Sequence, residues 1–479
     1  MPSRHISIAV QAPEQIREGL ARLRSELEVP DDFPPQVQAE AERSATAPRE
    51  LGPRVDRRDI AFVTIDPEGS MDLDQAMFLE RDGEGYLVWY AIADVAAWLE
   101  PGGEVDREAH RRGQTFYAPS QRAPLHPPAL SEGAASLLAD GIARPALVWQ
   151  VRLDAAGAQT EARVERALVS SRERLSYRQV QQLLDEDRAP EWLLLLREIG
   201  TLREQQEVQR GGVSLNLPEQ EIVDEAGQWH IESRSPLPVE GWNAQISLLT
   251  GMAAAEMMLA GGVGVLRILP PADERSVAKL RRTAQSLGIS WPEQMDYPDF
   301  VRSLDVSQPR HLAMMNECTT LFRGAGYTLI GPDNQRTNLK HNALAANYAH
   351  CTAPLRRLVD RYVGEICVHL SAGTPIPQWV TDALPLLPDE MAESDRRAKK
   401  FERGVVDLTE ALVLSSRIGE VFTGTLVDYD EQKGNGAISI ADPAIEAHVK
   451  IKGLELGASV QVRLVSVDLV AGKVDFALA

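Results

Sequence analysis

Three aspartates lie close together in one short stretch, TIDPEGSMDLDQA (residues 64–76), at the end of the apolar run IAFVTI. Asp72 and Asp74 are two residues apart, so their side chains point the same way from an extended chain, and the intervening loop can bring Asp66 back onto them. Clustered carboxylates raise one another's pKa unless a cation neutralises them. Oxygen ligands of this kind suit Mg²⁺ or Mn²⁺ rather than zinc. The pattern indicates a divalent-metal site, with a polar loop of capping and turn aspartates as the alternative.

A second group that could act on a phosphate lies in HCTAPLRRL. The run from Pro354 to Leu370 predicts a helix, with Thr352 as its N-cap and Gly373 just beyond its end. Arg356 would then lie in the first turn, where unpaired N–H groups and the helix dipole favour an anion. A guanidinium there can bind two phosphate oxygens and stabilise charge that grows in a transition state.

The elements that must position these groups are of mixed type. Apolar runs from about residue 55 onward predict strands, among them IAFVTI, YLVWYAIADVAAWL and a hairpin of ALVWQVRL with ARVERALV around residues 154–157. Helical spacing dominates residues 176–210 and 240–290. Because the strands and helices do not alternate regularly, the sequence predicts a multidomain α+β fold with a large mixed α/β catalytic domain.

The two ends of the chain differ from its centre. Residues 1–54 are predicted to form a small helical N-terminal module, interpreted either as a packing helix pair or as a nucleic-acid-contacting module. Residues 419–479 contain five short apolar runs broken by Gly, Asp and Pro, which is the count and size of a five-stranded OB-type β-barrel. Residues 55–400 remain as one large central domain.

Composition narrows the class of protein. The 479 residues include 44% apolar and 25% charged residues, which is ordinary globular composition. Three cysteines without CxxC spacing argue against a disulfide framework or a zinc site. No apolar stretch reaches the ~20 residues that a membrane span needs. We expect a cytoplasmic monomer with no membrane association. The net charge of −20 leaves the partner open, because an acidic chain can still hold a basic channel or use its carboxylates for metals.

Further stretches, in the same order along the chain, make it similar to a known family: the IADV of YAIADVAAW, TFYAPSQRAPLHPPALSEGAASL, RGGVSLNLPEQEI and HNALAANYAHCTAPLRRLVDRY. With the aspartate loop they resemble the catalytic (RNB) domain of RNase II and RNase R, 3′→5′ exoribonucleases that hydrolyse RNA. The resemblance implies that Asp66, Asp72 and Asp74 are metal ligands, with Asp74 at the most activity-critical position. Gln75 stands where the family has a fourth aspartate; it can offer a metal a carbonyl oxygen but no negative charge.

The same resemblance assigns roles outside the aspartate loop. Arg356 takes the position of the family's catalytic arginine, and Tyr117 that of a tyrosine that packs against the 3′-terminal nucleotides. Arg357 is either a second RNA contact or the partner of Asp360 in a structural ion pair. His341 and His350 flank the arginine segment and are interpreted as core histidines rather than metal ligands.

The C-terminal unit resembles the S1-like OB module that is common in this family. Within it Lys450 and Lys452 would meet RNA phosphates, and Phe422 and His448 are further candidate contacts.

The sequence thus predicts a metal-dependent hydrolytic exoribonuclease that degrades single-stranded RNA from its 3′ end to 5′-mononucleotides, with Mg²⁺ (or Mn²⁺) as cofactor. The main alternative is a catalytically impaired RNA-binding protein on the same scaffold, motivated by Gln75. A third interpretation is a carboxylate-rich metal hydrolase that acts on a small phosphoester.

Overall fold

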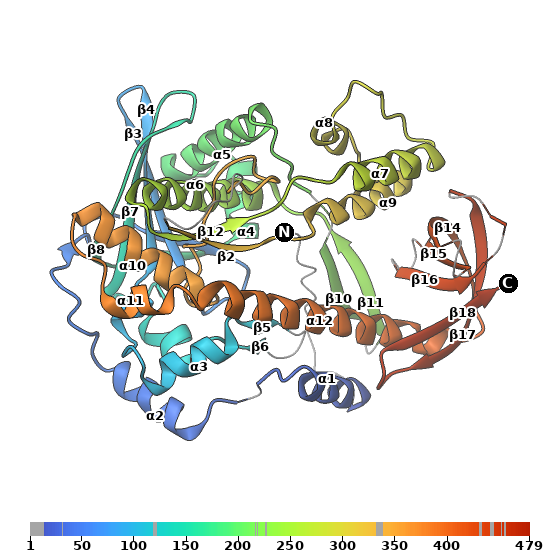
Figure 1. Cartoon of the computed structure of the whole chain (residues 1–479), viewed down its shortest axis with the longest axis horizontal. Helices are drawn as coiled ribbons and strands as arrows, with labels where there is room; N and C mark the ends of the chain where they lie inside the picture. Colours follow the sequence, from blue (N-terminus) through green and yellow to red (C-terminus); the bar gives the residue numbers. More distant parts are fainter. Residues whose placement is uncertain are drawn as a thin grey trace.

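The computed structural model describes residues 14–479 except residues 31, 118–121, 216, 218, 226–227, 332–338, 431–433, 441–444, 452 and 455–456. A large α/β body lies at one end, a small barrel lies at the other, and one long helix runs between them (Figure 1). The mixed α/β class and the five-stranded C-terminal barrel predicted from the sequence are confirmed.

The large body is built on a seven-stranded sheet with the order β1-β8-β7-β4-β3-β2-β9. Its pairs are antiparallel except β1 with β8 and β2 with β9. The strands are β1 Val55–Asp56, β2 Val63–Asp66, β3 Gln75–Asp82, β4 Gly85–Ala93, β7 Arg144–Leu153, β8 Gln159–Val169 and β9 Glu173–Ser176. The central strands β4 and β7 are buried on both faces, which explains their nearly continuous apolar sequences. The predicted hairpin is confirmed as β7–β8.

Helices cover both faces of this sheet. The largest apolar cluster joins the central strands to one group of helices: α4 Tyr177–Asp185, α5 Glu191–Gln209, α6 Pro238–Gly261, α10 Leu358–Ala372 and α11 Gln378–Ala383. A second cluster packs against the other face with shorter elements: α2 Pro35–Ser44, η1 Val95–Ala97, α3 Glu104–Arg112 and the π-helix η2 Leu130–Ala134. The sheet is therefore buried between two layers and forms a rigid base for the loops at its strand ends.

The predicted helical region 240–290 is interrupted, because a strand lies between α6 and α7 Glu274–Ser286. This strand, β12 Gly264–Ile268, pairs with β13 Gly326–Ile330 in a separate antiparallel ladder. Between β12 and β13 the chain forms α7, α8 Tyr297–Arg302, α9 Pro309–Cys318 and η3 Thr319–Phe322. Two further ladders join β5 Phe116–Tyr117 to β6 Arg122–Ala123, and β10 Glu219–Glu225 to β11 Gln228–Arg234.

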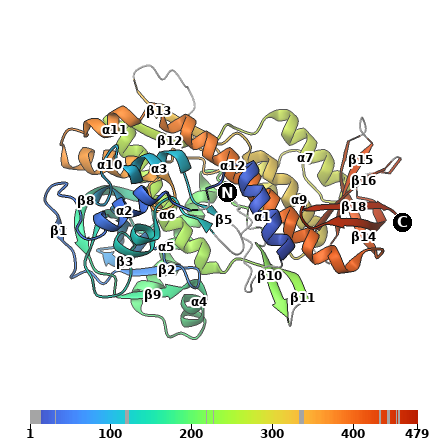
Figure 2. The ribbon, with the colours of Figure 1, turned by 90° about the horizontal axis from the view of Figure 1, so that it is seen from below.

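The long helix α12 Leu387–Leu414 connects the large body to the barrel, and it is followed by η4 Ser415–Arg417. The first described helix, α1 Glu14–Glu26, packs along α12 through Ile16, Leu20 and Phe401 (Figure 2). The two predicted N-terminal helices are thus present as α1 and α2, but they pack on different partners, because α2 lies against α3.

The C-terminal barrel has the strand order β16-β15-β14-β17-β18. Its strands are β14 Val421–Asp430, β15 Asn435–Ile440, β16 Ile445–Lys450, β17 Ser459–Asp468 and β18 Lys473–Leu478. β16 and β18, at the two ends of this order, also contact each other, so the barrel is nearly closed. Alternate residues of β16 and β17 face its core, as expected for strands with one solvated face.

The three cysteines Cys318, Cys351 and Cys367 are buried free thiols. In the part of the chain that the structure describes, no helix combines the length and the apolarity that crossing a bilayer requires.

Candidate active site

The aspartate loop joins two neighbouring strands of the sheet. Asp66 is the last residue of β2, and the chain then turns at Pro67–Ser70, where the Ser70 N–H donates to the Pro67 carbonyl and Gly69 has a φ of 82°. This positive φ at the third position of the turn is one that glycine adopts without strain. The turn returns the chain toward β3, so Asp66 lies near the residues that precede β3.

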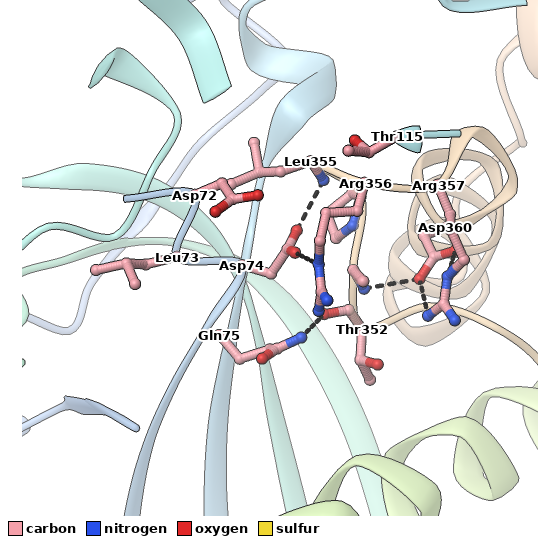
Figure 3. A network of polar contacts seen from close by, with 12 residues as sticks. Asp72, Leu73, Asp74, Gln75, Thr115, Thr352, Leu355, Arg356, Arg357 and Asp360 are labelled. Atoms are coloured by element: carbon pink, nitrogen blue, oxygen red, sulfur yellow. Dashed lines mark hydrogen bonds and ion pairs between the residues drawn. The ribbon is translucent and has the colours of Figure 1, made fainter. Parts of the chain in front are cut away.

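The segment before β3 is held in an extended conformation by the chain around Ser136. The Leu73 N–H donates to the Ser136 hydroxyl at 3.0 Å, and the Leu73 carbonyl accepts from the Leu137 N–H at 3.0 Å. The Leu73 side chain is fully buried in the second apolar cluster, and Figure 3 shows it pointing away from Asp74. Alternation along extended chain therefore places Asp72 and Asp74 on the side opposite Leu73, as the sequence predicted.

Asp74 meets the segment that carries Arg356, 282 positions further along the chain. One carboxylate oxygen accepts from the Leu355 N–H at 2.7 Å, and the other accepts from Arg356 Nε at 2.6 Å (Figure 3). The Asp74 side chain is 1% exposed, whereas that of Arg356 keeps 39% of its surface exposed. Arg356 can therefore contact a ligand on its solvent-exposed side while Asp74 holds the Nε side of its guanidinium.

The predicted helix around Arg356 begins later than expected. Its N-cap is Arg357 rather than Thr352, so Pro354 and Arg356 lie in a turn before α10 and not in its first turn. The turn is closed by the Ala353 carbonyl, which accepts from the Arg356 N–H at 3.0 Å, and by the Ala353 N–H, which donates to the Asp360 carboxylate at 2.7 Å. The dipole argument for Arg356 is therefore wrong, and Asp74 positions this arginine instead. The predicted end of the helix is confirmed, with Gly373 as its C-cap at a φ of 63°.

The other contacts of the arginine segment come from two sides. The Thr115 N–H donates to the Arg356 carbonyl at 2.9 Å, and the Leu358 N–H donates to the Gly113 carbonyl at 2.9 Å. The Gln75 amide nitrogen donates to the Thr352 carbonyl (Figure 3). With its nitrogen on Thr352, the side-chain oxygen is the Gln75 atom that could meet a metal, and its role as a ligand stays a prediction.

Asp72 also has an arginine partner, which the sequence analysis did not single out. Its carboxylate lies 2.6 Å from an Nη of Arg122, and the other Nη of Arg122 lies 2.7 Å from Glu132. Arg122 is paired directly opposite Tyr117 in the β5–β6 ladder, which brings both side chains to the site. Local sequence carries no signal for this contact, because it depends on how the β5–β6 pair packs on the aspartate loop.

Burial dominates the electrostatics of the Asp66 and Asp74 carboxylates. Burial raises the pKa of Asp66 to about 6 and that of Asp74 to about 7, and Arg356 opposes both shifts. Asp72 contributes a further upward shift to each pKa, so its carboxylate is close enough to repel those of Asp66 and Asp74. Asp66 Oδ2 is buried and has no hydrogen-bond partner.

These features fit a hard divalent cation. Among the described residues no group of three His, Cys, Asp or Glu side chains is drawn together closely enough to hold a metal ion. Mg²⁺, however, is usually held by one or two carboxylates together with substrate phosphates and water, not by a complete protein cage. The unpartnered oxygen of Asp66 and the desolvated carboxylate of Asp74 supply donors of that kind.

Metal ions are therefore expected to stabilise the protein more strongly at high pH than at low pH. Because the pKa values of Asp66 and Asp74 are raised to about 6 and about 7 in the folded protein, the metal-free fold is most stable when both groups are protonated. That stability is lost as pH rises from about 4, the usual pKa of an aspartate, through these raised values. A cation that binds the ionised carboxylates reverses this loss. The rise in melting temperature caused by Mg²⁺ or Mn²⁺ should be clearly larger at pH about 8 than at about 5.5. Equal rises at both pH values, measured by calorimetry, would contradict metal binding by these two carboxylates.

The remaining predicted site residues lie around the arginine segment and in the barrel. Tyr117 is half-buried next to the arginine segment; burial raises the pKa of its hydroxyl, and Arg356 acts in the opposite direction. Arg357 makes two hydrogen bonds to Asp360, at 2.9 and 3.0 Å, so the ion pair proposed as the alternative to RNA contact is present.

Lys450 is exposed at the end of β16, and Lys452 lies outside the described residues.

The structure also tests the predictions made for Phe422 and for the histidines His341 and His350. Phe422 is 4% exposed and packs edge-on against Phe476 in the barrel core, so it is not available to RNA. His350 is partly buried and its Nδ1 lies 2.7 Å from the Tyr327 hydroxyl, while His341 is 8% exposed. His341 is a core histidine, as predicted, whereas His350 is only partly enclosed; desolvation lowers the pKa of each.

Comparison with known proteins places this geometry in context. A protein-family model described as RNB domain matches residues 54–371, and one described as RNase II-type exonuclease C-terminal S1 domain matches residues 420–479. Ribonuclease R of Escherichia coli (strain K12) is 27% identical over 477 residues, which cover 89% of this chain and 57% of that protein. Ribonuclease R of Aquifex aeolicus (strain VF5) is 27% identical over 498 residues, which cover 94% of this chain and 68% of that protein. The chain thus spans little more than half of the E. coli protein.

Solved structures share the fold at lower identity. Mycoplasma genitalium RNase R in complex with ribose methylated single-stranded RNA superposes with a TM-score of 0.86 at 19% identity, covering 97% of this chain and 78% of that chain. Yeast Ssd1, described as a pseudonuclease, superposes with a TM-score of 0.67 at 16% identity, covering 87% and 53% respectively. At these identities the similarity concerns the fold alone, which is carried by active and inactive proteins alike.

Proposed function

Because the chain belongs to the RNB domain family, which matches it over residues 54–371, we propose that it is a metal-dependent hydrolase that shortens single-stranded RNA from the 3′ end and releases 5′-mononucleotides. One observation carries the proposal beyond family membership. The most buried aspartate of the loop, Asp74, holds Arg356 by a 2.6 Å hydrogen bond from a segment 282 positions away. A carboxylate site that can hold a metal ion and a guanidinium beside it can together stabilise the charge that develops in phosphodiester hydrolysis.

Asp66 and Asp74 would hold the divalent cation, with Asp72 adding negative charge and Gln75 a neutral oxygen. When bound, such an ion lowers the pKa of a water molecule and stabilises charge on the phosphate and on the leaving oxygen. Asp74 orients the Arg356 guanidinium through Nε, and the partly exposed side chain can then contact a phosphate. Arg356 would offset the negative charge that grows on the phosphorane.

Binding of RNA would draw on groups at both ends of the molecule. Tyr117 would stack on a base near the 3′ end, which is a sequence-independent contact. In the barrel, Lys450 and Lys452 would neutralise phosphates of the upstream strand. Arg357 would contribute positive charge to the same path, although its guanidinium is held by Asp360.

The stacking role of Tyr117 predicts a change in the final product. Tyr117→Ala should lengthen the limit oligonucleotide by about one nucleotide or more, because a stacked base contributes roughly 1–3 kcal/mol that a short RNA cannot replace. Limit digests of 5′-labelled RNA, resolved on a sequencing gel, measure this length. Tyr117→Phe keeps the ring and should give the wild-type product. An unchanged product for the alanine variant would assign Tyr117 to packing only.

A catalytically impaired RNA-binding protein is the second candidate, and Gln75 favours it. The side chain adds no negative charge to the loop, and its amide nitrogen is committed to the Thr352 carbonyl. Incubation of 3′-labelled single-stranded RNA, its DNA counterpart and a small phosphodiester with Mg²⁺ or Mn²⁺ separates the candidates. Labelled mononucleotide from RNA alone supports the exoribonuclease. RNA that stays intact but shifts on a native gel supports the binding protein, and turnover of the small diester supports the third interpretation.

A further inference from the structure

Arg122 is held between two carboxylates at the edge of the aspartate loop. Its two terminal nitrogens lie 2.6 Å from Asp72 and 2.7 Å from Glu132. The Arg122 and Asp72 side chains are 27% and 12% exposed, so solvent screens their attraction less than it would on an open surface. Asp72 belongs to the loop before β3 and Glu132 to η2, so the guanidinium bridges two different parts of the fold.

This bridge changes what the loop offers to a cation. A divalent ion near Asp66 and Asp74 would draw on the negative charge of Asp72, whether or not Asp72 ligates it directly. Arg122 already offsets that charge, in the same way that Arg356 offsets the charge of Asp74. Two neighbouring carboxylates of the loop, Asp72 and Asp74, are therefore each paired with an arginine side chain.

Glu132 lowers the free-energy cost of separating Arg122 from Asp72. Breaking a half-buried ion pair is costly when one partner is left without an opposite charge. If Asp72 turns toward a metal ion, Arg122 keeps its second partner, Glu132, at 2.7 Å. The cost of releasing Asp72 is lower than it would be for an arginine with one carboxylate partner, such as Arg81, which pairs with Glu198.

We propose that Arg122 is a built-in counter-ion of Asp72 that competes with divalent cations for the aspartate loop of the RNA-free protein, and that Glu132 draws Arg122 away from Asp72. The inference rests on the proposed function only in taking this loop as the metal site. It makes Arg122 and Glu132 positioning residues that set how much metal the loop takes up before RNA arrives.

The test measures Mn²⁺ binding to the RNA-free protein, and electron paramagnetic resonance reports the concentration of free Mn²⁺. Arg122→Gln should bind Mn²⁺ at least about fivefold more tightly than wild type, because the competing charge is gone. Glu132→Gln should bind about threefold more weakly, because Arg122 then has Asp72 as its one remaining carboxylate. Arg122→Lys keeps the charge and should stay closer to wild type than Arg122→Gln.

A matched pair controls for net charge. Arg81→Gln and Glu198→Gln remove one positive and one negative charge, respectively, from the ion pair at Arg81, which lies about 20 Å along β3 from Gln75. Each variant should leave Mn²⁺ affinity within about twofold of wild type. Unchanged or weaker binding by Arg122→Gln would overturn the proposal. Should that variant fail to fold, unchanged or tighter binding by Glu132→Gln overturns it equally. Failure of wild type to hydrolyse RNA would refute the proposed function, whereas the order of these Mn²⁺ affinities does not depend on turnover and would still test the role of Arg122.

Discussion

Asp74→Asn should reduce the release of mononucleotides from single-stranded RNA by about a thousandfold while leaving RNA affinity within about threefold of wild type. The asparagine oxygen can still accept from the Leu355 N–H, which now binds Asp74 at 2.7 Å. The new amide nitrogen, however, would face Arg356 Nε, and two donors cannot bond to each other. The substitution therefore removes a metal ligand and the anchor of Arg356 in one step without changing the size of the side chain.

The measurement is a single-turnover rate with 3′-labelled RNA, with affinity obtained separately by filter binding. Asp82→Asn provides a matched control, because Asp82 pairs with Arg152 at the opposite end of β3 and is 42% exposed. That variant should keep a rate within about twofold of wild type, as expected for a surface ion pair. Near-normal turnover by Asp74→Asn would remove the central support for the proposed chemistry.

Arg356→Ala is expected to lower kcat by about a hundredfold to a thousandfold and to change KM by less than about tenfold. The guanidinium is positioned by Asp74 and partly exposed, so it is placed to act on a phosphate as charge develops rather than to capture RNA. Arg356→Lys should recover only part of the rate, because an ammonium cannot bind two phosphate oxygens in the planar arrangement of a guanidinium. Parallel losses in kcat and in affinity would show that Arg356 binds the ground state equally well.

A double-mutant cycle tests whether Asp74 acts partly through Arg356. If it does, Asp74→Asn combined with Arg356→Ala should be scarcely slower than Asp74→Asn alone, because the arginine is already displaced in the single variant. Additive losses would instead mean that the two residues contribute independently. The cycle also bears on the binding-protein alternative, since a catalytically impaired chain would show no rate to lose in any of the variants.

Much of the fold could be predicted from local patterns. The β7–β8 hairpin and the five strands of the barrel have apolar alternation or short apolar runs bounded by turn residues, which depend on neighbours in the sequence. The strand β12 was missed because it lies inside a long apolar region between two helices, where periodicity does not separate a buried strand from a buried helix. Its identity depends on the distant partner β13.

The start of α10 shows a different limit. Pro354 suggested a helical first turn, yet the segment before Arg357 is drawn out of the helix by contacts with Asp74, Thr115 and Gln75. Each of these contacts joins segments far apart in the chain, so no local propensity could reveal them. The catalytic role predicted for Arg356 is still proposed, but a carboxylate rather than a helix dipole positions its side chain.

By itself the sequence determined which chemical groups are present and how the nearest of them are oriented: two aspartates share one face because side chains alternate along an extended strand. Only the tertiary structure decided which charges meet. It brings Arg356 onto Asp74 and Arg122 onto Asp72, from positions well separated along the chain. The physical reason is that such pairs form where independently stabilised layers pack together, and the energy that selects them comes from burial over the whole body rather than from the residues themselves.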